Sequence, residues 1–229
     1  MTRKVVKDFE DLKKFINEYS LNTSLSLPEF IASLKAFHKA YFSFLNLVTR
    51  LEHQNIWPLE VSYRLKESCS DIGQALFLMC HGAYKPANLI LRSSIENYAK
   101  GIGFYEDPSI LTMKNLYEVF DVAKSFKGCT GIDFSKLMGS LHIDYGELCD
   151  YTHTATIDEM AHISALNVLP QFDIDKANAL STIAIRVLKN YVIIILFSFK
   201  KEFFRIDPDN RDSILCILSA TLNRDLHSN

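Results

Sequence analysis

The sequence predicts an all-α protein, a helical bundle of seven to nine helices that forms one domain over residues 1–229. Apolar residues recur every three or four positions through most of the chain, which is the period of one helix face. Gly (8) and Pro (6) together make 14 of 229 residues, about half of their usual share of roughly 12%. No stretch shows the apolar–polar alternation of a half-buried strand.

Composition favours a soluble globular protein. Hydrophobic residues are 48% and charged residues 23% of the chain, which excludes an intrinsically disordered class. The net charge of −2 provides no general cationic field, so nucleic-acid binding would need a local patch. The five cysteines are scattered without a CxxC pair, and the N-terminal MTRKVVKDFEDLKKF lacks the apolar core of a signal peptide. Both features predict a cytoplasmic location.

The first 27 residues are expected to form a helical appendage to the bundle. Asp8 can cap a short helix whose apolar residues, from Phe9 to Tyr19, share one stripe. The polar stretch at residues 22–27 is then expected to break it.

Three long helices should follow. Pro28 suits a first helical turn, and the most sustained apolar stripe in the chain runs from there to about Gln54. A second stripe covers Val61–Met79, and its short link predicts an antiparallel neighbour. Pro86 restarts a helix that extends to Ile102.

The second half of the chain is also expected to be helical. Two helices are predicted at Thr112–Phe126 and Phe134–Tyr151, followed by a short one at Asp158–Leu166. A long helix should then begin at a cap, either Asp173 or Asp175, and end near Phe204. The terminal residues 205–229 should contain an amphipathic helix at Arg211–Leu226.

The most apolar run is Tyr191–Phe199. Nine residues span only about 14 Å as a helix, roughly half of a bilayer core, so the run predicts a buried central helix and no membrane span. Together with the aromatic stripe at Phe30–Leu51, this run provides more apolar surface than the core of one small bundle obviously needs. These two surfaces therefore predict a homodimer.

Searches for common catalytic and cofactor motifs find nothing. The chain contains no GxxxxGK[ST], GxGxxG, HExxH or GxSxG and no paired Cys/His zinc spacing. This argues against a P-loop enzyme, a Rossmann dehydrogenase and a zinc protease, and no cofactor is predicted.

The first candidate feature is Arg92 with Glu96. Their i,i+4 spacing puts both on one helical face, where they could pair. Apolar residues surround Arg92, and a charge in such a turn needs a partner. The pair is therefore either a structural tie between helices or an anion-binding arginine oriented by Glu96.

The second candidate feature is the segment YGELCDYTHT. On a helix, Tyr145, Cys149 and His153 form one stripe, and Asp150 lies three residues before His153, where it could orient the imidazole. His153 could then act as an acid or base near neutral pH, bind a ligand, or simply cap the helix end.

A metal site is not predicted. His142, His153 and His162 lie near this segment together with Cys149. His142 and His153, however, are about 16 Å apart along one helix, because eleven residues separate them.

Two segments resemble a diffuse group of HEPN-like helical proteins, many of them from bacterial antiviral defence and toxin–antitoxin systems. The segments are ANLILRSSIE (Ala87–Glu96) and YGELCDYTH (Tyr145–His153). The resemblance implies a helical bundle, often dimeric, in which Arg92, Glu96, Tyr145 and His153 approach one another in a polar cleft. HEPN ribonucleases carry an arginine about five residues before the histidine of the same helix, whereas Leu148 stands there in this chain. A ribonuclease would thus need Arg92 from another helix or a second protomer.

Two classes of function follow from these features. The chain could be a HEPN-like module that binds a partner protein, a nucleotide or RNA within such a system. Alternatively it could be a metal-independent ribonuclease, with His153 as the acid and base and Arg92 stabilising the phosphate.

Overall fold

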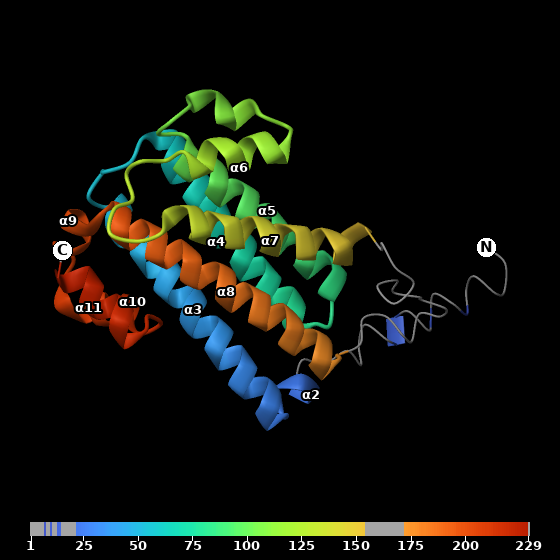
Figure 1. The fold of residues 1–229 in the computed structure, drawn as a ribbon. Coiled ribbons are helices and arrows are strands. Elements are labelled where there is room, and N and C mark those ends of the chain that lie inside the picture. The colour runs from blue at the N-terminus through green and yellow to red at the C-terminus, as the bar shows by residue number, and fades with distance from the viewer. Residues whose placement is uncertain (1–6, 8–9, 11–12, 15–21, 154–171, 229) are drawn as a thin grey trace.

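The predicted all-α fold is confirmed. The computed structural model describes residues 7, 10, 13–14, 22–153 and 172–228, and these contain α-helices and one 3₁₀ helix but no strand (Figure 1). Most of the predicted helix after Asp8 lies outside these residues, and so does all of the short helix predicted at Asp158–Leu166.

The described helices, in chain order, are α2 (Asn22–Leu25), α3 (Pro28–Glu52), α4 (Leu59–Cys80), α5 (Tyr84–Gly103), the 3₁₀ helix η1 (Pro108–Thr112), α6 (Leu116–Lys124), α7 (Phe134–His153), α8 (Ile174–Ser198), α9 (Lys200–Phe203), α10 (Pro208–Leu215) and α11 (Ala220–Ser228).

Helix α5 is the centre of the bundle. It packs against α4, α6, α7 and α8, while α3 packs against α8 and α4. Figure 1 shows α3 and α8 side by side, with α7 crossing beside them and α10 and α11 at one end. The candidate residues on α5 and α7 are therefore held by the most heavily packed part of the molecule.

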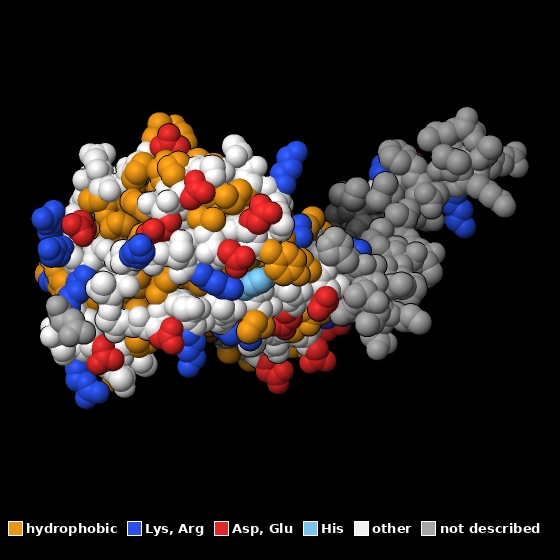
Figure 2. Space-filling view, turned by 45° about the horizontal axis from the view of Figure 1, so that its top comes forward, with side chains coloured by type: hydrophobic (Ala, Val, Ile, Leu, Met, Phe, Trp, Pro, Cys, Tyr) orange, Lys and Arg blue, Asp and Glu red, His pale blue; other side chains and the backbone are white. Residues whose placement is uncertain are grey.

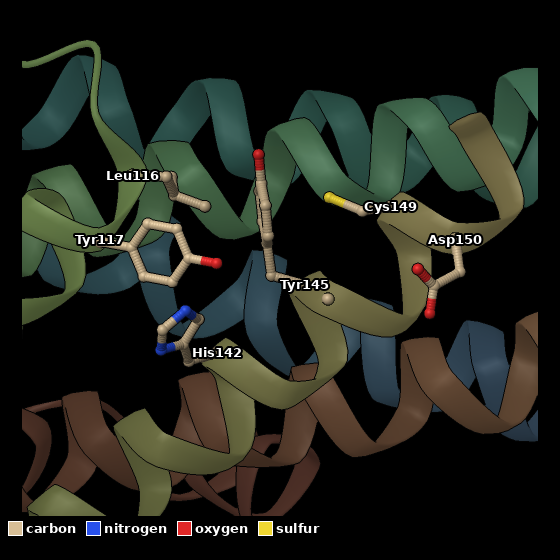
Figure 3. A pocket seen from close by; sticks show the side chains of 7 residues that line it. Leu116, Tyr117, His142, Tyr145, Cys149 and Asp150 are labelled. Carbon is tan, nitrogen blue, oxygen red and sulfur yellow. The ribbon is translucent and has the colours of Figure 1, made fainter. Parts of the chain in front are cut away.

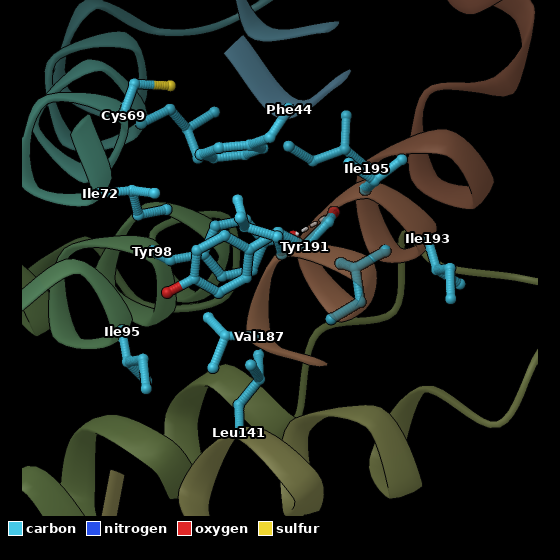
Figure 4. Packing of buried hydrophobic residues seen from close by; sticks show 14 of the residues in the cluster. Phe44, Cys69, Ile72, Ile95, Tyr98, Leu141, Val187, Tyr191, Ile193 and Ile195 are labelled. Atoms are coloured by element: carbon cyan, nitrogen blue, oxygen red, sulfur yellow. Dashed lines mark hydrogen bonds between the residues drawn. The ribbon is translucent and has the colours of Figure 1, made fainter. Parts of the chain in front are cut away.

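The core is built around two stacked tyrosines. Tyr98 of α5 and Tyr191 of α8 are fully buried, and their rings lie 3.7 Å apart between centroids at 6° (Figure 4). The Tyr98 hydroxyl donates to the backbone oxygen of Tyr191 at 2.9 Å. Phe44 of α3 packs beside them, 5.1 Å from the Tyr191 ring. Three helices thus meet at one aromatic cluster.

The apolar run of α8 is the predicted buried central helix. Residues 191–197 are all buried. Among the described helices, α8 is long and apolar enough to cross a membrane, but 78% of its most apolar window lies inside the bundle. This is typical of a core helix in a soluble protein.

Both surfaces that predicted a homodimer are largely used within the bundle. Phe30, Phe37 and Phe44 on α3 are fully buried, as is Tyr191 at the start of the apolar run. A dimer would therefore need a different surface.

Several predicted boundaries are wrong. Residues 22–25 form a helical turn where a break was predicted. The helix expected at Thr112–Phe126 is α6, which begins only at Leu116 after the Asn115 cap, whereas Thr112 is the last residue of the separate helix η1. The long helix ends at Ser198 because Phe199 leaves helical geometry (φ −123°, ψ 40°). Its ring packs on Trp57 at 5.8 Å.

The C-terminal helix is divided as well. Asp207 accepts a hydrogen bond from the backbone nitrogen of Asn210 and begins α10. The chain leaves helical geometry again between Leu215 and Ala220, before α11. Either Asp173 or Asp175 was predicted to cap the start of α8. The cap is Asp173, whose side chain accepts hydrogen bonds from the backbone nitrogens of Asp175 and Lys176.

Gly103 lies where α5 meets η1 and α6. A Cβ there would overlap Cδ1 of Ile110 and lie 3.2 Å from the backbone Cα of Ala123. We expect Gly103→Ala to lower the free energy of unfolding by about 2 kcal/mol, because the α6 backbone must shift. Gly101→Ala is the matched control in the same helix, since its Cβ meets only ordinary contacts at 3.4 Å and beyond. Urea denaturation compares the two; equal stabilities would contradict this packing.

Candidate functional site

Arg92 projects from α5 toward α7. Its Nη1 donates to the hydroxyl of Tyr145 at 2.9 Å and to Sγ of Cys149 at 3.6 Å. The guanidinium carbon lies 5.2 Å from the centroid of the Tyr145 ring, within the range of a cation–π interaction. Tyr145 and Cys149 are one turn apart on α7, so Arg92 is in contact with the first part of the second segment.

Glu96 acts on Arg92 through its charge, which helps to raise the pKa of Arg92, but its hydrogen bond goes to another cation. Its carboxylate accepts from Nζ of Lys100 at 2.8 Å, and the Lys100 side chain is only 8% exposed. A glutamate four residues before a lysine is the more favourable i,i+4 order, whereas Arg92 before Glu96 is the reverse. Glu96 thus neutralises the buried Lys100, which leaves Arg92 to the polar face of α7.

Helix α7 is fixed at its start and along its side. The Asp133 side chain accepts from the backbone nitrogen of Lys136 at 3.0 Å, satisfying a nitrogen that the first helical turn leaves free. Further along, the Arg186 side chain of α8 donates to Asp144 at 2.6 Å and to Glu147 at 2.8 Å. These contacts orient the turn that carries Tyr145.

A cleft of about 350 Å³ opens between α6 and α7, and Tyr145 and Cys149, the two residues that Arg92 contacts, line it. Its lining residues are Leu116, Tyr117, His142, Tyr145, Gly146, Cys149 and Asp150. In Figure 3, Tyr117 and His142 lie at one end, Tyr145 stands in the middle, and Cys149 and Asp150 lie at the other end. Aromatic rings therefore form the walls, and an exposed carboxylate lies at one edge.

Two ring residues of the cleft are uncharged near neutral pH. Burial raises the pKa of Tyr145 to about 12, despite the opposing effect of Arg92, so its phenol stays protonated and cannot act as a base. Burial also lowers the pKa of His142, with Lys124 adding to the effect. The His142 ring stacks on Phe120 at 4.4 Å. Both residues can offer flat surfaces and neutral hydrogen-bonding groups.

The other predicted site residues are placed in part. Asp150 is exposed and lines the cleft. His153 is the last residue of α7, but its side chain lies outside the described residues, so its predicted contact with Asp150 is untested. His162 also lies outside them. Within the described ranges, no group of three or more His, Cys, Asp or Glu side chains could hold a metal ion.

Sequence reasoning missed Tyr117 and Lys100 as parts of this region. Helix α6 has only nine residues, so Tyr117 belongs to no sustained periodic pattern. His142 could have been linked to Tyr145, because the two lie three residues apart on a helix that was predicted correctly.

Charges of both signs surround hydrophobic side chains on the face shown in Figure 2, and no continuous basic stripe crosses the part of it that the structure describes. A long nucleic-acid backbone would need such a stripe.

Comparisons of the chain with known protein families, with characterised proteins and with solved structures give no match.

Proposed function

We propose that this chain is a HEPN-like helical binding module that takes a nucleotide, free or at the end of an RNA, in the cleft between α6 and α7. A cytoplasmic role in a bacterial defence or toxin–antitoxin system, together with a partner protein of that system, belongs to the same proposal. The observation that carries it is the contact of Arg92 with Tyr145 beside an aromatic cleft.

The residues of the cleft match the two chemical parts of a nucleotide. A flat base can stack on exposed aromatic rings, and Tyr117 with His142 supplies them at one end. A phosphate prefers the planar fork of an arginine. Arg92 lies behind two residues of the cleft wall, since its Nη1 donates to Tyr145 and Cys149, and it would reach a phosphate at the cleft between them.

Loss of the arginine should therefore weaken nucleotide binding. With fluorescent ATP, fluorescent GTP and a short labelled RNA as probes, we expect Arg92→Met to raise the dissociation constant at least about tenfold, since hydrogen bonds to charged groups contribute about 1.5–3 kcal/mol. Fluorescence anisotropy measures this. Tyr117→Ala should weaken binding as well, through the lost stacking surface.

Arg64→Met is the matched control. Arg64 is also a partly buried arginine, and it donates to Asn97 at 2.8 Å away from the cleft, so the variant removes the same charge. Equal weakening by the two arginine variants, or no binding of any probe by the wild type, would contradict the proposed function.

The alternative is a metal-independent ribonuclease. It is favoured by the position of His153, which lies on the stripe of Tyr145 and Cys149, about 6 Å of helix rise beyond Cys149. His153 would remove the proton of a 2′-hydroxyl, whose oxygen attacks phosphorus, and would return that proton to the 5′-oxygen as the bond from phosphorus to the 5′-oxygen breaks. Arg92 would stabilise the charged phosphorane, and the products are a 2′,3′-cyclic phosphate and a 5′-hydroxyl.

Incubation with RNA in EDTA separates the two functions. The binding module predicts intact RNA with the wild type and with His153→Ala. Cleavage by the wild type that leaves cyclic phosphate ends, and that His153→Ala abolishes, would favour the ribonuclease.

A further inference from the structure

Most of the buried polar atoms without a hydrogen-bond partner lie at the end of the bundle where α9, α10 and α11 gather (Figure 1). The described residues contain seven such side-chain atoms. Four of them belong to this end: Oε1 of Gln54, Nε1 of Trp57, Nζ of Lys200 and Oδ1 of Asn223. Gln54 and Trp57 follow α3 and reach this end through contacts with Glu202 and Phe199. Because buried polar atoms in folded proteins are nearly always paired, several unpaired ones in one region point to a polar ligand.

The break between α8 and α9 places the first of two cations at this end. Phe199 leaves helical geometry where its ring packs on Trp57, and Lys200 begins α9. Nζ of Lys200 lies 6.0 Å from the centroid of the Phe204 ring, within the range of a cation–π interaction. The ring offsets only part of the cost of burying an ammonium group, which is otherwise met by an anion.

The second cation, Arg211 of α10, lies over the same ring. Its guanidinium carbon is 5.8 Å from the Phe204 centroid, so both cations lie within 6.0 Å of one point. Neither forms an ion pair with a described residue, although Glu202 lies in the same helix as Lys200. His227 of α11 packs edge to face on the ring at 5.2 Å. Two unpaired cations on one ring repel each other, and a shared anion would remove this repulsion.

We propose that Lys200 and Arg211 form a binding site for a polyphosphate anion. Phosphate oxygens suit the planar fork of an arginine and the point charge of a lysine. A chain of two or three phosphates also carries several charges and can contact both cations at once. After half a turn about its last side-chain bond, the amide of Asn223 would present its nitrogen in place of the unpaired Oδ1 and donate to the same anion.

This anion site is separate from the cleft between α6 and α7. None of the residues that form it lines the cleft, and it does not rest on the proposed function. Free inorganic polyphosphate and the triphosphate of a nucleotide share the chemistry that the site recognises.

Titration with sodium tripolyphosphate tests the site. We expect the wild type to bind, and Lys200→Met and Arg211→Met each to raise the dissociation constant at least about tenfold, because each removes a charged hydrogen-bond donor. Calorimetry measures the binding. The emission of Trp57 follows it at this end of the bundle, since Trp57 is the only tryptophan in the chain and packs beside the residue before Lys200.

Lys201→Met is the matched control. Lys201 is exposed and next in the sequence, so the variant removes the same charge without touching the anion site. It should change the dissociation constant by less than about twofold, as for an exposed charge. Circular dichroism confirms that each variant is folded. No binding by the wild type, or equal weakening by Lys200→Met and Lys201→Met, would overturn the inference.

Arg92→Met separates the anion site from the cleft. Tripolyphosphate should bind to this variant as tightly as to the wild type, and loss of that binding would place the anion in the cleft and overturn the inference. Failure of the proposed function is distinguishable, since it concerns only the nucleotide probes. ATP then identifies the source of the phosphates. If Arg92→Met still binds ATP and a further Lys200→Met change removes this binding, a nucleotide supplies them; binding of tripolyphosphate without ATP identifies a free polyphosphate.

Discussion

Tyr191→Ala is expected to lower the free energy of unfolding by about 4 kcal/mol, the typical loss when a large aromatic side chain is removed from a core. Tyr191 is completely buried where α3, α5 and α8 meet. Alanine removes its stacking on Tyr98 and its packing on Phe44, and it leaves a cavity that three helices cannot close together. Urea denaturation followed by circular dichroism measures the loss.

Tyr191→Phe separates packing from hydrogen bonding. Phenylalanine keeps the ring and loses only the hydroxyl, which lies 3.3 Å from Oγ of Ser94. A loss of about 1 kcal/mol is expected for this variant. If the alanine variant were as stable as the phenylalanine variant, the ring stack would not be the centre of the core.

The long helices could be predicted because their apolar stripes are continuous. Pro28–Glu52 was predicted to end within two residues of its observed end, and α4 and α5 were predicted within about two residues at each boundary. Short helices could not be predicted in this way. The helices η1 and α9 have only five and four residues, which is too short for a repeating apolar pattern to be recognised. The break at Phe199 has a tertiary cause, its packing on Trp57, which no local pattern contains.

The candidate site could be predicted only in part. The sequence indicated that Arg92 needs polar neighbours and that Tyr145 begins a polar stripe, and the two are in contact. The hydrogen bond of Glu96 to Lys100 was not predicted, because cations lie four residues to either side of Glu96 and the choice between them depends on the burial of Lys100. Tyr117 was invisible because only the docking of α6 on α7 brings it to the cleft.

Arg186→Met is expected to lower the free energy of unfolding at neutral pH by about 2 kcal/mol. The carboxylate of Asp144 is 1% exposed, and its Oδ2 has no hydrogen-bond partner, so Arg186 supplies its hydrogen bonds among the described residues. Removing one partner of a buried ion pair costs about 3–5 kcal/mol. The smaller value is expected here because Arg186 is itself 43% exposed.

The pH dependence of this loss identifies its cause. Burial already holds the pKa of Asp144 above its ordinary value, although Arg186 opposes the shift. Without the arginine this pKa rises further above that of the unfolded chain. A raised carboxyl pKa means that stability is highest below the unfolded pKa and is lost as pH rises through the folded one. The deficit of Arg186→Met should therefore be large at neutral pH and shrink toward about pH 4.

Two further variants complete the test. Glu147→Gln removes the exposed carboxylate bound by the same arginine and should change stability by less than about 0.5 kcal/mol. Asp144→Asn combined with Arg186→Met leaves no buried charge, so it should be more stable at neutral pH than Arg186→Met alone and should lose the extra pH dependence. A deficit of Arg186→Met that is equal at acidic and neutral pH would mean that the arginine acts by packing its aliphatic stem against α7, and that the buried charge of Asp144 does not govern how this helix is held.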